Sequence, residues 1–264
     1  MAKYAIGDIQ GCYTPLMKLL AKINYNPSID TLYLVGDLVN RGHESLKVLN
    51  WAYENQASIV TVLGNHDIYL LRRYHSTVKP DPDETIQDIL SSPDCKKLIG
   101  WLKCQPLVFQ NDRYILVHAG IYPKLNFTTL LEVCDLVSEE LQAKKPTTFL
   151  DNVFGNKPAL WSDDLEPLQQ MKFTINCCTR MRFLNVVDYS LDYKYKGDLA
   201  SMPDSLIPWF TVEFDPSIDK QILFGHWASL GFFQTQKFIA LDTGCVWGRK
   251  LTAINLDNFE IHQV

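Results

Sequence analysis

The sequence predicts an α/β protein in which helices cover a central β-sheet. Three strand–loop–helix units follow one another in the first hundred residues, and this alternation is typical of the class. In addition, 47% of the 264 residues are hydrophobic, so the chain can bury a sizeable core. A single domain over residues 1–264 is expected, because the motifs described below run from residue 7 to residue 227.

The three early units are short β-branched strands, each followed by a helix. Their expected bounds are strands over 4–6, 31–35 and 58–63, and helices over 44–54 and from about residue 68. The first helix is predicted to begin at Thr14 and Pro15, which suit the N-cap and the first helical position. Its apolar stripe consists of Leu16, Leu19, Leu20 and Ile23.

The chain becomes polar and proline-bearing between residues 74 and 105, before a helical stretch at 97–103. This segment is predicted to be a helical insertion that caps the site. The later elements are expected to be a helix over 128–141 and strands over 114–117, 221–224, 238–241 and 251–255.

Charge and cysteine content argue against several classes of protein. A net charge of -5 and a pI of about 5.7 provide no basic surface for an extended nucleic-acid groove. The N-terminus reaches Gly7 and Asp8 too early to contain a secretory signal, and no later run has membrane-spanning length. The seven cysteines include no Cys-x-x-Cys pair, which indicates reduced thiols. We therefore expect a soluble, cytoplasmic protein with no membrane partner.

Polar side chains follow five strands at the points where the strands end. They are Asp8, Asp37, Asn65, His118 and His226. Loops beyond the carboxyl ends of neighbouring strands meet in one crevice of an open α/β sheet, so these side chains are expected to share one site. Their mixture of carboxylate, amide oxygen and imidazole suits manganese, iron or zinc better than calcium or magnesium.

The motifs around these residues resemble those of the calcineurin-like metallophosphoesterases. The motifs, in chain order, are GDIQG, GDLVNRG, GNHD, HAG and GHW. The resemblance implies that superfamily's sandwich of two central β-sheets flanked by helices, here with a helical cap insertion at about 74–105. Three further segments, TRMRF, GHWAS and LDTGCVWG, resemble the branch of bacterial symmetrical bis(5'-nucleosyl)-tetraphosphatases.

The resemblance also implies two divalent metal ions, with manganese the first choice and cobalt, iron or zinc as alternatives. It maps Asp37 to the ligand shared by both ions and Asp8 to the first ion. It maps Asn65, His118 and His226 to the second ion. Gln10 departs from the family pattern, because many relatives carry a histidine ligand there. Gln10 could be a weak ligand or could leave a water in its place, and both interpretations stay open.

The remaining candidate residues concern the substrate. The resemblance makes His66 the acid toward the leaving group, with Asp67 orienting its imidazole; the alternative is that His66 only hydrogen-bonds the phosphate. Arg41 is expected to bind the phosphate through the N–H donors of its planar guanidinium group.

Arg180 and Arg182 lie two residues apart, so on an extended segment they would face the same side and both could reach a polyphosphate. Trp227 and Trp247 could stack on adenine or belong to the core.

The resemblance implies hydrolysis of diadenosine 5',5'''-P1,P4-tetraphosphate (Ap4A) to two ADP, by in-line attack of a hydroxide that bridges the metals. Nucleoside-tetraphosphate caps on RNA ends are further implied substrates. One alternative is a serine/threonine phosphoprotein phosphatase of the same superfamily. Another is a non-catalytic nucleotide sensor, suggested by the weak first metal site that Gln10 would create. The oligomeric state stays open.

Overall fold

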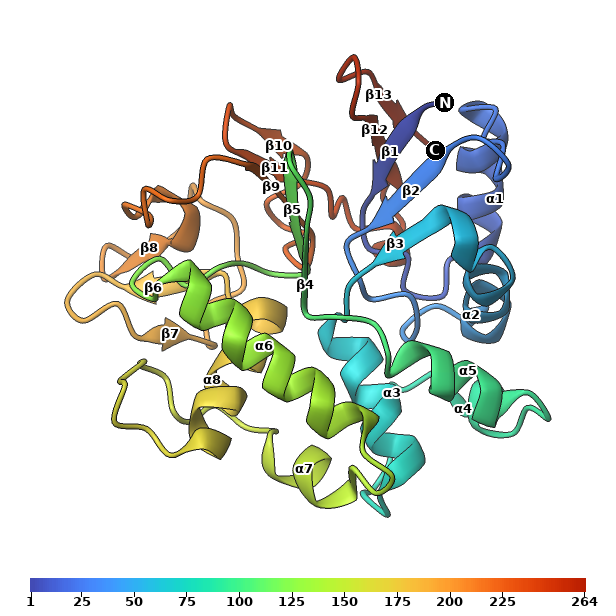
Figure 1. The fold of residues 1–264 in the computed structure, drawn as a ribbon. Helices are drawn as coiled ribbons and strands as arrows, with labels where there is room; N and C mark the ends of the chain where they lie inside the picture. The colour runs from blue at the N-terminus through green and yellow to red at the C-terminus, as the bar shows by residue number, and fades with distance from the viewer.

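Two five-stranded β-sheets face each other in the computed structural model, which describes residues 1–264 (Figure 1). The first sheet has the order β13 (Ile261–Gln263), β12 (Thr252–Asn255), β1 (Lys3–Ile6), β2 (Thr31–Leu34) and β3 (Ile59–Thr61). The second has the order β10 (Phe233–Gln234), β11 (Phe238–Ala240), β9 (Gln221–Phe224), β5 (Tyr114–Val117) and β4 (Val108–Gln110). The predicted two-sheet α/β sandwich is confirmed.

Each sheet contains three neighbouring strands that run parallel to one another. In the first sheet β1 pairs with β2 and β2 pairs with β3 in parallel register. In the second sheet β9 pairs in parallel register with both β5 and β11. Parallel neighbours end on the same side, so each sheet presents three carboxyl ends together.

The inner faces of the two sheets pack on each other through a small apolar layer. Its members are Ala5, Tyr33, Val35, Val62, Tyr114, Leu116, Leu223, Ile239, Leu241, Ile254 and Leu256. The outer faces pack under helices within a larger cluster of 61 buried residues, which includes the predicted stripe of the first helix. Side chains alternate between the two faces of a strand, so each sheet packs one face on the other sheet and the opposite face under helices.

The early part of the chain supplies five helices. They are α1 (Tyr13–Lys22), α2 (Ser45–Glu54), α3 (Asn65–His75), α4 (Gln87–Leu90) and α5 (Cys95–Leu102). Helices α1 and α2 flank the first sheet, and the other three lie beyond the ends of its strands (Figure 1). The segment 74–105 thus forms two short helices, and α5 packs beside α2 and α3 (Figure 1).

A longer insertion separates the neighbouring strands β5 and β9. It contains α6 (Phe127–Gln142), α7 (Thr147–Asn152), α8 (Pro167–Arg180) and a small sheet of β7 (Leu191–Asp192), β6 (Phe183–Asn185) and β8 (Leu206–Pro208). The sequence predicts only the first of these helices. Helix α7 and the three strands are short, so they carry little periodic signal. Helix α8 is 14 residues long but is buried on nearly every side from residue 173 to 179, so it shows no clear apolar stripe.

Two helix starts differ from the sequence prediction. The first helix begins at Tyr13, with Cys12 at the N-cap position, and the Thr14 hydroxyl donates to Glu44 Oε1 at 3.3 Å instead of capping the helix. Helix α3 begins at Asn65 and not near residue 68. The carboxylate of Asp67 accepts the Gly64 N–H at 2.9 Å and so stabilises this earlier first turn.

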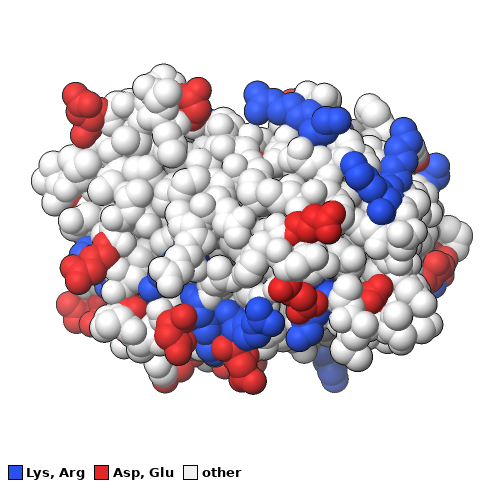
Figure 2. Space-filling model, turned by 90° about the horizontal axis from the view of Figure 1, so that it is seen from above, with Lys and Arg blue, Asp and Glu red and all other residues white.

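The end of the molecule at which β1 begins has scattered charges around a largely uncharged centre (Figure 2). Basic side chains gather at the upper right of this view, acidic side chains lie at the left, both kinds mix along the lower rim, and no continuous basic stripe crosses the face (Figure 2). None of the seven cysteines is in a disulfide. No helix combines the length and the apolar character needed to cross a bilayer.

Candidate functional site

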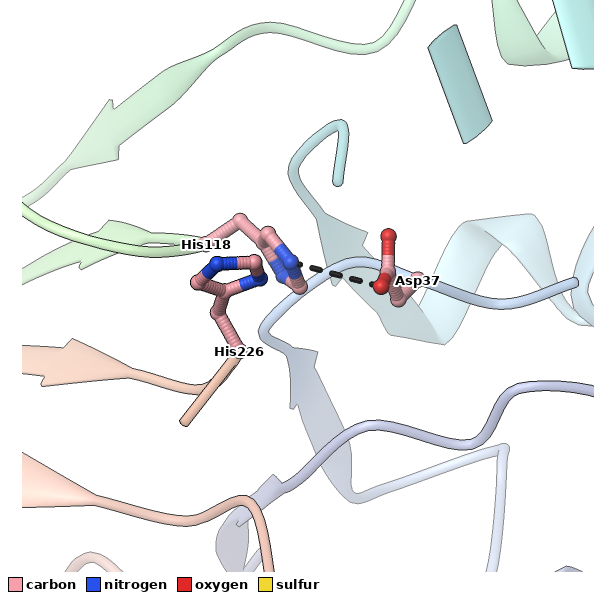
Figure 3. Close-up of side chains that lie close together, drawn as sticks. All are labelled: Asp37, His118 and His226. Atoms are coloured by element: carbon pink, nitrogen blue, oxygen red, sulfur yellow. Dashed lines mark ion pairs between the residues drawn. The ribbon is translucent and has the colours of Figure 1, made fainter. Parts of the chain in front are cut away.

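The predicted strand-end residues meet where the two sheets adjoin. Asp8 follows β1, Asp37 follows β2, and Asn65 opens α3 after β3. His118 and His226 follow β5 and β9 of the other sheet. One ligand atom each from Asp37, His118 and His226 lies within 4.8 Å of the others, and Figure 3 shows these side chains converging from the two sheets.

The carboxylate of Asp37 is the centre of this cluster and has no solvent exposure. Its Oδ1 accepts the His66 N–H at 2.8 Å, and its Oδ2 accepts from Gln10 Nε2 at 3.0 Å. The same Oδ2 lies 3.4 Å from His118 Nε2 (Figure 3). Burial would raise the pKa of Asp37, but the neighbouring charges of His118 and His66 hold it below its usual range. Asp37 therefore stays ionised in the interior.

His118 is held in one tautomer by the first sheet. Its Nδ1 lies 2.8 Å from the Val35 carbonyl oxygen and donates to it, which leaves Nε2 to face Asp37. Burial would lower the pKa of His118, but Asp37 and Asp8 raise it to about 10. A divalent cation bound here has to displace the proton on Nε2, because only the neutral nitrogen can be a ligand.

Two buried polar atoms of the cluster lack any hydrogen-bond partner. They are Asp8 Oδ2 and His226 Nε2. Burial, together with Arg182 and His118, lowers the pKa of His226, so its ring is neutral. Unpartnered buried polar atoms are costly in a folded protein, and a cation would satisfy a carboxylate oxygen and a neutral imidazole together. The residues present therefore fit divalent metal ions.

Asn65 and Gln10 approach the cluster in different ways. The Asn65 amide lies between the two histidines, and its nitrogen donates to the Thr179 carbonyl oxygen and to His226 Nδ1, each at 3.0 Å. Gln10 meets the cluster through its amide nitrogen, which donates to Asp37. Both interpretations of Gln10 given above stay open, because this hydrogen bond involves the amide nitrogen and not the oxygen that would be a metal ligand.

His66 is oriented by a residue that the sequence prediction assigned to no role. Its Nδ1 lies 3.0 Å from Asn40 Nδ2. The expectation that Asp67 orients the imidazole is corrected by the structure, since the Asp67 carboxylate accepts the backbone N–H groups of Asp37, Leu38 and Gly64. Asp67 thus fixes the loop after β2. Asn40 belongs to the GDLVNRG motif, but the sequence does not indicate its contact with His66, because that contact depends on tertiary packing.

The sequence predicts that Arg180 and Arg182 lie on one extended segment, and this prediction is wrong. Arg180 is the last residue of α8, and the chain becomes extended at Met181. Arg180 is braced by Asn176 Oδ1 at 2.8 Å and Asn156 Oδ1 at 2.9 Å, and its guanidinium lies over the Tyr193 ring. Arg182 donates to the His226 carbonyl oxygen at 2.9 Å. Both nevertheless line one pocket beside the cluster.

Two pockets adjoin the cluster. The larger, of about 560 Å³, is called the basic pocket, and its charged lining includes Arg41, Arg180, Arg182, Lys196 and Arg249. The smaller, of about 250 Å³, is called the side pocket, and its apolar lining includes Ile68, Val153, Phe154 and Ile175. The pockets share Arg41, Asn65, His66 and Arg180. A ligand with two arms could therefore extend from the cluster in both directions.

Asp242 is a further residue at the basic pocket that the sequence prediction missed. It is buried, and its Oδ1 accepts the Gly244 N–H at 3.0 Å. The sequence could have indicated Asp242, because it follows β11 in the same way that the five predicted residues follow their strands.

Backbone strain is concentrated at the cluster. Of eight non-glycine residues with positive φ, five lie here: Gln10, Asp37, Asn40, Arg41 and His226. Each such residue costs about 1–3 kcal/mol and persists where the surroundings enforce it, which is typical of functional sites.

Comparisons with known proteins agree with this geometry. A family model described as calcineurin-like phosphoesterase matches residues 3–228. The symmetrical bis(5'-nucleosyl)-tetraphosphatase of Neisseria meningitidis is 43% identical over 264 residues, covering 100% of this chain and 95% of the relative. The protein of the same name from Chromobacterium violaceum is 42% identical over 261 residues, covering 99% and 94%.

Solved structures share the fold at lower identity. A crystal structure provisionally assigned as a diadenosine tetraphosphatase matches with a TM-score of 0.63 at 22% identity, covering 99% of this chain and 92% of that chain. The cold-active protein-tyrosine phosphatase of a Shewanella species matches with a TM-score of 0.54 at 17% identity, covering 99% and 76%. Likeness at these identities concerns the fold alone.

The close approach of Gly225 to Asp8 yields a prediction for metal binding. A Cβ atom at residue 225 would collide with Asp8 Oδ1, so Gly225→Ala should displace that carboxylate. We expect its affinity for Mn²⁺ to fall roughly 10- to 100-fold in calorimetric titrations, the range found when the support of a ligand is removed. Gly100→Ala is the control, since an added Cβ in α5 meets nothing within 4 Å. Unchanged affinity in a folded Gly225→Ala protein would contradict the placement of Asp8.

Proposed function

This chain belongs to the calcineurin-like phosphoesterase family, and on that premise we propose that it hydrolyses Ap4A symmetrically to two ADP. The observation that carries the proposal is the buried Asp37–His118–His226 cluster, which opens onto a pocket lined by arginine side chains. The names of relatives above 40% identity over nearly the whole chain support this choice of substrate.

The proposal includes two divalent ions, with manganese preferred. Asp37 would contact both ions, and Asp8 the first, with Gln10 at its edge. Asn65, His118 and His226 would hold the second. When bound, such ions supply an activated water for in-line attack and neutralise charge on the phosphoryl oxygens. The unpartnered Asp8 Oδ2 and His226 Nε2 support this ligand set.

The chain's own side chains would bind and orient the polyphosphate. Arg41 and Arg182 present forked donors beside the cluster, and Arg180 is braced before any ligand arrives. Preorganised donors of this kind stabilise developing charge without a reorganisation cost. His66 would give a proton to the leaving group, with Asn40 as the residue that positions its ring.

The same pocket supports a second class of substrate. Its arginine lining would bind any tetraphosphate, so nucleoside-tetraphosphate caps on RNA ends are included in the proposal.

The cysteines bear on the compartment. All seven are unpaired, which supports an assignment to the cytoplasm, where thiols stay reduced.

Product analysis tests the proposed reaction most simply. We expect Ap4A and Mn²⁺ to yield ADP as the only nucleotide product in a chromatogram. ATP together with AMP would mean asymmetrical cleavage and would contradict the proposal. A phosphopeptide assayed in parallel tests the serine/threonine phosphatase alternative, and we expect the activity to be far lower. If the protein bound Ap4A and cleaved neither compound, it would be the nucleotide sensor.

A second prediction concerns His66. The leaving ADP ends in a phosphate with a pKa of about 6, far lower than that of an alcohol, so it needs less help from an acid. His66→Ala should therefore reduce the hydrolysis of O-phosphoserine, on the order of 100-fold, more than that of Ap4A. The measurement is kcat for both substrates in the altered and unaltered proteins. Equal losses on both substrates would exclude the acid role.

A further inference from the structure

The two tryptophans near the site have opposite environments. Trp227 is 2% exposed, whereas Trp247 is 64% exposed although it lines the basic pocket. An exposed indole buries little apolar surface, so the Trp247 side chain contributes little to the packing of the core. Core packing therefore does not account for a tryptophan at residue 247.

Trp227 has a structural role that accounts for its burial. Its Nε1 lies 3.2 Å from the Gly197 carbonyl oxygen and 3.0 Å from Ser229 Oγ. Its ring packs against Phe183 at 4.4 Å between centroids. These contacts hold the loop that carries Lys196 against the turn after β9. Trp227 is thus not available to a ligand.

Trp247 is presented on a rigid turn. It ends the short helix η3 (Cys245–Trp247), which lies between Gly244 and Gly248, both with φ of +77°. The Trp247 N–H donates to the Gly244 carbonyl oxygen at 2.9 Å, and the Arg249 N–H donates to the same oxygen at 3.2 Å. The turn positions the indole without covering it.

Two other aromatic rings beside the site are each paired with a cation. The Tyr193 ring lies under the Arg180 guanidinium at 4.7 Å, and the Phe154 ring lies under that of Arg72 at 4.3 Å. Trp247 takes part in no such pair with a ring or a cation. It shares the rim of the basic pocket with Arg249, whose Nη1 lies 3.3 Å from the Ala228 carbonyl oxygen.

We propose that Trp247 is the platform on which one adenine base of the substrate stacks, and that it sets the preference for nucleotides over other phosphate compounds. This inference rests on the proposed function. The phosphate chain lies along the arginines of the basic pocket, and the base at its end meets the free indole face. Stacking tolerates any base, so the preference is for nucleotides as a class and not for adenine alone.

Trp247→Ala tests the proposal through binding as well as catalysis. Stacking of one base on an aromatic ring contributes ~1–3 kcal/mol, which corresponds to a roughly 5- to 150-fold change. We expect KM for Ap4A and the calorimetric Kd for ADP, both with Mn²⁺, to rise within this range. We also expect the ratio of kcat/KM for Ap4A to that for bis(p-nitrophenyl) phosphate to fall. Trp247→Phe should recover most of the loss.

Phe259→Ala is the control, because Phe259 is another exposed aromatic residue, 38% exposed, in the turn between β12 and β13. It should leave KM, Kd and the ratio unchanged. If Trp247→Ala bound ADP as tightly as the unaltered protein, the stacking role would be overturned. The titration with ADP does not depend on turnover, so it tests Trp247 even if Ap4A proves not to be the substrate.

Discussion

The buried carboxylate of Asp37 determines how the loops of the site are arranged around it. A charge without solvent exposure has to be matched by its neighbours, and it is matched by groups from three separate segments: Gln10 after β1, the His66 N–H at the start of α3, and His118 after β5. These contacts require an exact registration of the two sheets, since Asp37 follows a strand of one and His118 a strand of the other. They also require glycine at residue 64, because a Cβ there would collide with the carboxylate.

The fold divides the tasks of the site between two kinds of segment. Short loops at the strand ends hold the cluster, and backbone strain at Gln10, Asp37 and His226 is tolerated because the sheets behind them are fully packed. The insertion between β5 and β9 supplies Arg180, Arg182 and Lys196 to the lining of the basic pocket. Variation in such an insertion can change the pocket without disturbing the Asp37 cluster.

Much of the cluster could be predicted from the sequence, because a physical rule connects sequence to position. A polar residue directly after a strand lies at the carboxyl edge of its sheet, and parallel neighbours share that edge. The rule brought Asp8, Asp37, Asn65, His118 and His226 together correctly. It could not identify the contact of Asn40 with His66, nor place Arg180 at a helix end, because these depend on how a loop or a helix packs in three dimensions.

We propose that the Asp37 cluster holds two metal ions at once. Anomalous scattering from crystals grown in saturating Mn²⁺ tests this occupancy. We expect two peaks in each chain, both next to the Asp37 carboxylate, with the second also next to His118 and His226. A single peak, or none at the cluster, would contradict it.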